Sequence, residues 1–398
     1  MIKIKNKFRH LWLPLTVGLI SLSLIGLTLF RASQKQRETQ NQNLELKRQI
    51  IGNNETIKSL QAEIDRLNNE DLRKTNTEVK KEISDLKSSF KAAVDAYEQI
   101  IILQERGSKV TSEQSKFSSV LNFLAKNDFP SAQKTVGDLM AEINSEKTKL
   151  ASAVTTPLPA NVPEIKDAPV SGYRRQKVVV GDASFLVDVV SADLAGTKVI
   201  VDTASDGTCA NDCPVLPLAT YVSRNNAYAG VNGTYFCPET YPSCVDKKNS
   251  FDVLVMNKNK VYFNSDNNVY SSVPVAIFSG NSARFIDQSS GWGRDTGVDA
   301  VIANRPLLVL DGNIMFGSGG GEKETIRSNR SFLGSSGSTG YIGVVHNATV
   351  VESAKVLQAM GIKNALNLDS GGSTAMWSGG YKVGPGRNLP NVVLFVKK

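Results

Sequence analysis

Residues 365–374 read ALNLDSGGST, a short apolar run that ends in an aspartate beside a loop rich in glycine and hydroxyl groups. The apolar run predicts a buried β-strand, and side chains at strand ends next to such loops commonly carry chemistry. Because Gly371 and Gly372 lack Cβ atoms, the loop backbone can approach a ligand closely and offer N–H groups to an anion such as phosphate. Asp369 would then lie beside the bound group. The other interpretation is an aspartate that only fixes the turn.

The residues before this loop predict a strand, a helix and a second strand. Residues 341–345 (YIGVV) are strand-like, and Thr349 followed by Glu352 is a capping-box pattern that begins a helix. Gly361 lies where a helix commonly ends. If both strands belong to one sheet, a right-handed crossover places Asp369 at the carboxyl end of the second strand.

Four blocks of sequence, in order, resemble the phosphodiester glycosidase family. The family pattern Asn-Leu-Asp-Gly-Gly-Gly-Ser-Ser/Thr-x-Met is similar to residues 367–376, where Ser370 replaces the first glycine. The other blocks are GVNGTYF at residues 230–236, Arg330-Ser331, and RNLPN at residues 387–391. The resemblance covers about residues 173–398, slightly more than half of the chain.

The resemblance implies cleavage of a glycosyl phosphodiester, and glycoside cleavage ordinarily uses carboxylates. Asp369 is the first catalytic candidate, to stabilise an oxocarbenium-like centre or to direct water. Asp311 is the second, although Leu310-Asp311-Gly312-Asn313 equally predicts a hairpin turn. The only histidines are His10 and His346, and no Gly-x-Ser-x-Gly sequence accompanies them, so a Ser–His–Asp triad is not expected.

The same blocks supply candidates for substrate binding. Arg330 and Arg387 are expected to bind the phosphate, because guanidinium matches its oxygens, or else to be surface ion-pair partners. Asn232 is expected to bind a sugar hydroxyl or to fix its loop. Tyr235 with Trp292 would form a platform under the sugar or pack in the core. The complete expected set is Asn232, Tyr235, Arg330, Ser370, Gly371, Gly372, Ser373, Thr374 and Arg387.

Two further expectations concern this region. Residues 317–321 are glycine-rich and, with residues 322–325, predict a mobile flap at the cleft. Some glycosidases of this kind use a metal, so the resemblance allows calcium at Asp369 and Asn232. No ligand spacing in the sequence requires a metal.

The four cysteines lie close together in the same half of the chain. Outside the cytoplasm an even number of cysteines in short loops predicts two disulfides, with three pairings allowed. We expect Cys209–Cys213 and Cys237–Cys244, which close small loops. A zinc site is the alternative, but the spacings fit known zinc ribbons poorly.

Residues 11–30 predict a membrane span. They carry no formal charge over 20 residues, and the basic residues in 1–10 predict that this tail stays in the cytoplasm. A cleaved signal peptide is the competing interpretation, but the run is longer than usual for one. We therefore expect a single-pass membrane protein with its carboxyl-terminal part outside the cell or in the periplasm.

Residues 34–150 predict a helical stalk. Ile50, Ile57, Leu60, Ile64 and Leu67 follow the spacing of a coiled coil, and a second such run extends from Val79 to Ile100. The first run predicts either a homodimer through the stalk or helices packed within one chain. The net charge of +8 is spread between the tail and stalk and does not predict a nucleic-acid partner.

A proline-rich linker at residues 151–172 separates the stalk from a domain at 173–398. There the pattern becomes strand-like, so we expect an α+β fold with a mixed sheet. The predicted function is a membrane-anchored, outward-facing hydrolase that cleaves a glycosyl-1-phosphodiester of a surface or exopolysaccharide glycan. The alternatives are cleavage of the P–O bond and a non-catalytic polysaccharide-binding or scaffold protein.

Overall fold

The computed structural model describes residues 9–69, 71–152, 159, 161–268, 271–293, 295, 297–318 and 321–398. Side chains of residues 9–20, 69, 71, 72, 151, 152, 267, 268 and 322 lie outside this description. The chain divides into two compact units, Met1–Ser84 and Asp85–Lys398. Each unit is described by itself below.

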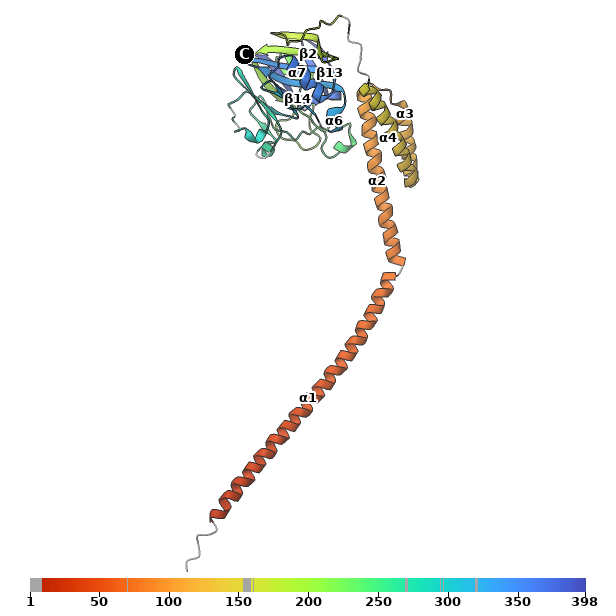
Figure 1. The fold of residues 1–398 in the computed structure, drawn as a ribbon, viewed down its shortest axis with the longest axis vertical. Coiled ribbons are helices and arrows are strands. Elements are labelled where there is room, and N and C mark those ends of the chain that lie inside the picture. Colours follow the sequence, from red (N-terminus) through yellow and green to blue (C-terminus); the bar gives the residue numbers. More distant parts are fainter. Residues whose placement is uncertain are drawn as a thin grey trace, which may run out of the picture. The chain divides into compact units, whose positions relative to one another are not determined.

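The first unit is helical. It contains α1 (Arg9–Asn69) and the beginning of α2 (Asp71–Glu105), and α1 is drawn in red and orange in Figure 1. Every side chain described in residues 21–68 of α1 is exposed. Within the described residues, no helix has a stretch that is both long and apolar enough to span a membrane. The predicted span at residues 11–30 lies partly outside the described side chains and stays a prediction.

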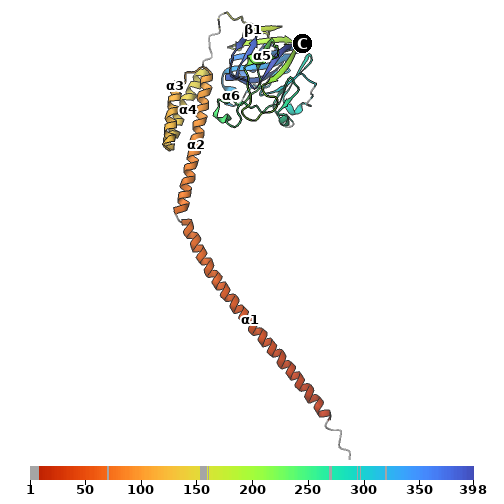
Figure 2. The ribbon, with the colours of Figure 1, turned by 180° about the vertical axis from the view of Figure 1, so that it is seen from behind.

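The second unit begins with a small helical bundle. Its members are the second half of α2, α3 (Thr111–Ala125) and α4 (Phe129–Ser152), which lie side by side in Figures 1 and 2. Apolar side chains at helical spacing, among them Ile100, Val120 and Leu139, are buried between them. Of the second predicted run, Ala93 and Ile100 are buried in this bundle, whereas Val79, Ile83 and Phe90 are exposed.

The rest of this unit is a β-rich domain. Its largest sheet has seven strands, in the order β1 (Gly172–Val180), β2 (Ala183–Asp193), β13 (Thr339–Ala348), β12 (Ser328–Ser336), β14 (Asn364–Ser370), β10 (Leu307–Leu310) and β11 (Asn313–Ile314). This helical region followed by a β-rich domain confirms the expected α+β class.

Two five-stranded sheets complete the domain. The first has the order β16 (Tyr381–Val383), β15 (Met376–Ser378), β4 (Ala229–Asn232), β17 (Asn391–Lys397) and β3 (Thr197–Thr203). The second has the order β6 (Tyr262–Phe263), β5 (Val255–Met256), β9 (Ala300–Ala303), β7 (Val275–Ser279) and β8 (Ser282–Ile286). The α-helices of this domain are α5 (Leu218–Arg224), α6 (Glu322–Thr325) and α7 (Val350–Ala359), and the short 3₁₀ turns are Pro242–Cys244, Ser265–Asn268, Ser289–Gly291 and Gly371–Ser373.

The prediction of a mixed sheet is wrong. Every pairing between named strands in the described part of the chain is antiparallel. Short turns join neighbours such as β1 and β2 or β12 and β13, and two strands joined by a short turn run antiparallel. The strands on either side of α7, β13 and β14, run in the same direction, but β12 lies between them.

The sheets and helices form layers with separate apolar cores. Helix α7 packs on one face of the seven-stranded sheet through Val350, Val356 and Leu357. The opposite face of that sheet packs on the two smaller sheets, where Leu366 and Leu368 of β14 are fully buried. Strand β14 is thus covered on both faces, which explains its nearly continuous apolar sequence.

The predicted strand–helix–strand unit is confirmed. Thr349 caps α7 by accepting from the Glu352 N–H at 3.1 Å, and the Glu352 carboxylate accepts from the Thr349 N–H at 2.8 Å. Gly361 follows the helix with φ of +77°, a conformation that glycine adopts without strain. The unit delivers Asp369 near the carboxyl end of β14.

Replacing Thr349 by Ala should lower the free energy of unfolding by about 1 kcal/mol, because one N–H of the first helical turn loses its acceptor. Thr349→Ser keeps the hydroxyl and is the matched control, expected to stay close to the parent chain. Urea unfolding followed by circular dichroism measures both. Equal losses for the two variants would contradict a role for the cap.

Candidate active site

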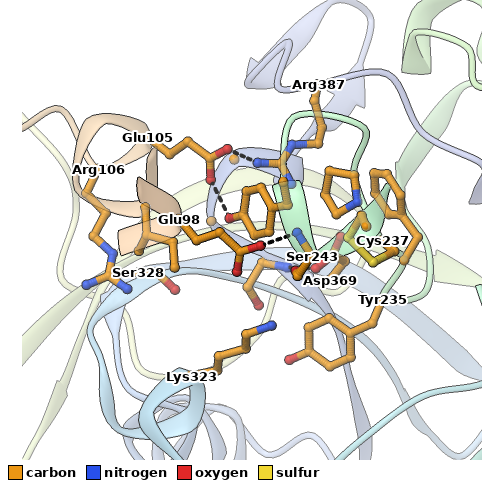
Figure 3. Close-up of a pocket in the computed structure, with 18 of the residues that line it drawn as sticks. Glu98, Glu105, Arg106, Tyr235, Cys237, Ser243, Lys323, Ser328, Asp369 and Arg387 are labelled. Atoms are coloured by element: carbon orange, nitrogen blue, oxygen red, sulfur yellow. Dashed lines mark hydrogen bonds and ion pairs between the residues drawn. A yellow bond between two sulfur atoms is a disulfide. The ribbon is translucent and has the colours of Figure 1, made fainter. Parts of the chain in front are cut away.

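A cavity of about 440 Å³ lies at the end of β14, bordered by groups from several parts of the second unit (Figure 3). The loop after β4 and the segment around α6 supply most of the polar lining from the β domain. The loop at residues 369–374, called the signature loop below, lines it through Asp369, Ser370, Gly371 and Gly372, and Arg330 and Arg387 line it as well. Helix α2 also contributes, through Glu98 and Glu105.

The backbone of Asp369 is held on both sides. Its N–H donates to the carbonyl of Gly233 at 2.9 Å, and its own carbonyl accepts from Asn232 Nδ2 at 2.8 Å. The carboxylate Oδ1 accepts from the Ser370 N–H at 2.8 Å. Only 8% of Asp369 is exposed, so the acid is fixed in a nearly dry position beside the cavity.

Asn232 fixes the loop and does not face a ligand. Besides its bond to Asp369, its Oδ1 accepts from the Ser331 hydroxyl at 2.6 Å and from the Ala375 N–H at 3.1 Å. The side chain is fully buried and does not line the cavity. The structure thus corrects the prediction that Asn232 binds a sugar hydroxyl. Two donors already use Asn232 Oδ1, and no acidic, cysteine or histidine cluster suited to a metal occurs in the described residues.

Burial changes the acidity of Asp369. It raises the pKa of the carboxyl from 3.8 to about 6, while Ser373, the Ser370 N–H and the charges of Arg387 and Lys323 act in the opposite direction. The group is therefore poised to change its protonation state near neutral pH. Such a perturbed acid beside a cavity is typical of functional sites.

We expect Asp369→Asn to stabilise the fold at pH 8 by up to about 3 kcal/mol and to have little effect near pH 4. Because the pKa of Asp369 in the folded chain lies above 3.8, the folded chain binds this proton more tightly than the unfolded chain. The stabilisation that results is present at low pH and is lost as the pH rises toward about 6. Urea unfolding over this range measures the difference. The exposed Asp311→Asn is the control, and a pH-independent difference for Asp369→Asn would contradict the burial cost.

The signature loop bends closely around its neighbours. Gly371 has φ of +65°, and a Cβ on Gly372 would lie 2.6 Å from Arg387 Nη2. Ser370, by contrast, has extended backbone with φ of −135°, so this position accepts a side chain without strain. The replacement of the family glycine is therefore compatible with the loop. Ser373 and Thr374 are buried and do not line the cavity, which corrects their predicted contact with substrate.

The two predicted phosphate ligands are placed differently. Arg330 is buried and donates to the carbonyls of Ala348, Lys323 and Ile326, so it holds the α6 segment in place at the cavity wall. Its burial lowers its pKa. Its main role is structural, although it also borders the cavity.

Arg387 points across the cavity toward α2. Its Nη2 forms an ion pair with Glu105, and its guanidinium carbon lies 5.3 Å from the centre of the Tyr241 ring. Burial has the largest single effect and lowers the pKa of Arg387, but Glu105, Tyr241 and Asp369 together outweigh it, so the pKa is raised. This guanidinium borders the cavity and is already paired with one oxyanion, the Glu105 carboxylate.

Tyr235 reaches the cavity from the loop after β4. Its N–H donates to Asn304 Oδ1 at 3.2 Å, and its hydroxyl accepts from Asn367 Nδ2 at 2.7 Å. Burial, and secondarily the charge of Asp369, raise the pKa of Tyr235 to about 12, so the hydroxyl keeps its proton. That proton remains available for donation. The expected partner Trp292 instead lies in the core against Tyr262.

Asp311 lies beside the beginning of β14, whereas Asp369 lies near its end. The structure therefore contradicts the predicted catalytic role of Asp311. It forms the hairpin turn between β10 and β11, and its N–H donates to Asn364 Oδ1 at the opposite end of β14. Asn364 and Asp369 are five residue steps apart along the strand, about 17 Å. His346 also lies elsewhere, where its Nε2 is 2.7 Å from Asp188 Oδ2.

Several cavity residues were not identified from the sequence. Lys323 and Glu324 come from the predicted flap, whose glycines were the only signal. Tyr241 and Lys247 lie in or beside the loop closed by the Cys237–Cys244 disulfide. No local pattern marks Glu98 and Glu105, because helical stalks are rich in glutamate. Both expected disulfides, Cys209–Cys213 and Cys237–Cys244, are present.

Comparison with known families agrees with this site. Residues 225–396 match the model of the phosphodiester glycosidase family. This match identifies a phosphodiester glycosidase domain at residues 225–396, somewhat less than half of the chain. The matched region contains Asp369, Arg387 and Tyr235, the three cavity groups with the clearest chemistry.

Two solved structures show partial similarity. A hypothetical protein from Synechocystis is 13% identical with a TM-score of 0.41, covering 57% of this chain and 62% of that one, so this chain spans less than two thirds of its length. The catalytic domain of zebrafish N-acetylglucosamine-1-phosphodiester alpha-N-acetylglucosaminidase, auto-inhibited by pro-peptide, is 15% identical with a TM-score of 0.45, covering 60% and 87%. A search of curated protein sequences found no significant match.

Proposed function

We propose that the β-rich domain hydrolyses a glycosyl-1-phosphodiester and releases the sugar. The observation that carries this proposal is the buried Asp369 carboxylate, which borders a cavity also lined by Arg387 and Lys323. A carboxylate beside an anion-binding group fits a substrate whose reacting carbon bears a phosphate. The family match supports the reaction type.

In this mechanism the phosphate is the leaving group. Arg387 and Lys323 bind its oxygens, and the bond between the anomeric carbon and the phosphate oxygen breaks. A phosphate monoester leaves readily, so strong protonation of it is unnecessary. Ionised Asp369 stabilises the positive charge that develops on the sugar or directs water to the anomeric carbon, which gains the hydroxyl.

Tyr235 is assigned to positioning in this mechanism. Its hydroxyl is held by Asn367 and retains its proton, so it can donate to a sugar or phosphate oxygen in the cavity. Glu324 is, among the described side chains of the β domain, a second carboxylate at the cavity wall, and it replaces Asp311 as the candidate for a second acid or base.

Asp369→Asn should lower kcat at least about 1000-fold on a panel of glycosyl-1-phosphodiesters, because the amide cannot ionise. Asp311→Asn changes a carboxylate of the same domain outside the cavity and should retain turnover. Release of free sugar is the measurement, with near-ultraviolet circular dichroism as the check of folding. A folded Asp369→Asn chain with normal turnover would contradict the proposal.

Two other outcomes of the same panel define the alternatives. Cleavage of the P–O bond would place oxygen from labelled water in the phosphate product, whereas the proposed reaction places it in the sugar. Binding of a glycan without turnover by the parent chain would favour a non-catalytic polysaccharide-binding or scaffold protein. The paired disulfides and the perturbed acid favour the hydrolase in an oxidising compartment.

We also propose that residues 11–30 anchor the chain in a membrane, with residues 1–10 in the cytoplasm and the β domain outside the cell or in the periplasm. The uncharged run and the preceding basic residues support this location. The substrate would then be a surface glycan that contains sugar phosphodiesters.

A further inference from the structure

Two glutamates of α2 enter the cavity of the β domain. Glu98 and Glu105 are seven residues apart, so they lie on the same face of the helix, two turns from each other. In Figure 3 both carboxylates point toward the groups that border Asp369. Both residues belong to the same compact unit as the cavity.

Each carboxylate is bound by donors that also suit phosphate. Glu105 Oε1 pairs with Arg387, and its Oε2 accepts from the Tyr241 hydroxyl at 3.1 Å. Glu98 Oε1 accepts from the Ser243 N–H at 2.6 Å. A guanidinium, a phenol and a backbone N–H are typical ligands of a phosphate group.

The Glu105 carboxylate also lies directly over the signature loop. A Cβ on Gly372 would be 2.9 Å from Glu105 Cδ, so the carboxylate occupies the space that the glycine leaves open. The side chain of Glu105 is only 24% exposed, whereas the glutamate of the ion pair Arg66–Glu63 is 50% exposed. Glu105 therefore differs from an ordinary surface ion-pair partner.

We propose that Arg387, Tyr241 and the Ser243 N–H form an oxyanion subsite for phosphate groups, and that α2 fills it with Glu98 and Glu105. The helix and a phosphate cannot use the same donors together, so α2 competes with the ligand. Displacement of the helix opens the subsite. That this competition controls turnover rests on the proposed function, whereas competition for phosphate binding does not.

Inorganic phosphate binding to the full chain tests the subsite by isothermal titration calorimetry. Glu105→Gln removes the charge that pairs with Arg387, so the apparent affinity should rise at least about tenfold as the open fraction increases. Glu98→Gln keeps an acceptor oxygen for the Ser243 N–H and should give a smaller rise. Glu82→Gln, an exposed position of α2 outside the cavity, is the matched control and should leave the affinity unchanged.

The outcomes separate the subsite from the proposed reaction. Tighter phosphate binding by Glu105→Gln, lost again in Glu105→Gln with Arg387→Ala, supports the subsite even if no substrate is cleaved. Unchanged affinity in folded Glu105→Gln and Glu98→Gln chains overturns the inference, even if the parent chain cleaves a glycosyl phosphodiester. Thermal melting shows that each variant is folded.

A second inference rests on α1 alone. Its apolar side chains Ile50, Ile57, Leu60, Ile64 and Leu67 are 49–59% exposed, so the described chain covers none of them. Isoleucine occupies the first heptad position and leucine the fourth, which favours parallel two-stranded coiled coils. If two copies of the helix align in register, Glu63 faces Asn68 of the second copy and Thr56 faces Gln61. No like charges then face each other across the seam.

We infer that this stripe pairs with a second copy of the chain in a parallel, in-register dimer. Ile57→Cys places a thiol in the seam, where mild oxidation of the full chain should give a cross-linked dimer. Glu55→Cys, on the outer face of the same helix, is the control and should cross-link at least about tenfold more slowly. The described cysteines are all in disulfides and add no background. Equal rates, or no cross-linking in either variant, would overturn the dimer.

Discussion

The side chain of Asn232 is the constraint on which the site depends. It joins the carbonyl of Asp369 in one sheet, the hydroxyl of Ser331 in the neighbouring strand and the N–H of Ala375 beyond the signature loop. These bonds connect the seven-stranded sheet to the sheet that contains β4. A buried amide with such partners is costly to disturb, because each lost bond leaves a polar group without water. The position of the catalytic candidate therefore follows from the packing of two sheets.

Hydrogen bonds of buried polar side chains also hold the rest of the site in place. Arg330 binds three carbonyls and holds the α6 segment, while Asn304 and Asn367 hold Tyr235. Asp369 and Arg387 both border the cavity, where Arg387 pairs with Glu105 of α2. Burial raises the pKa of the acid, and the nearby cation limits that rise. An environment of this kind can hold an anionic substrate and still supply a carboxylate near neutral pH.

Helix α2 connects the helical bundle to the β-rich domain through Glu98 and Glu105. The bundle buries its own apolar core, so its fold does not depend on contacts with the cavity. Its two glutamates nevertheless occupy donors that we propose as ligands of phosphate.

Local sequence determined the elements that depend on neighbouring residues. The capping box at Thr349, the glycine at the end of α7, the buried strand before Asp369 and both short-loop disulfides could be predicted because their partners lie only a few residues away. The family blocks similarly identified the loop and Arg387 as parts of one site.

Only the tertiary structure decided which distant groups meet. Asp311 has a suitable side chain, but the antiparallel pairing of β10 with β14 places it at the wrong end of the strand. Asn232 belongs to a family block, yet the closure of two sheets uses its amide inside the protein. Glu98 and Glu105 look like ordinary stalk residues until the bundle packs on the β domain. Sequence patterns report contacts within a turn or strand, whereas these three outcomes depend on contacts between residues more than 50 positions apart.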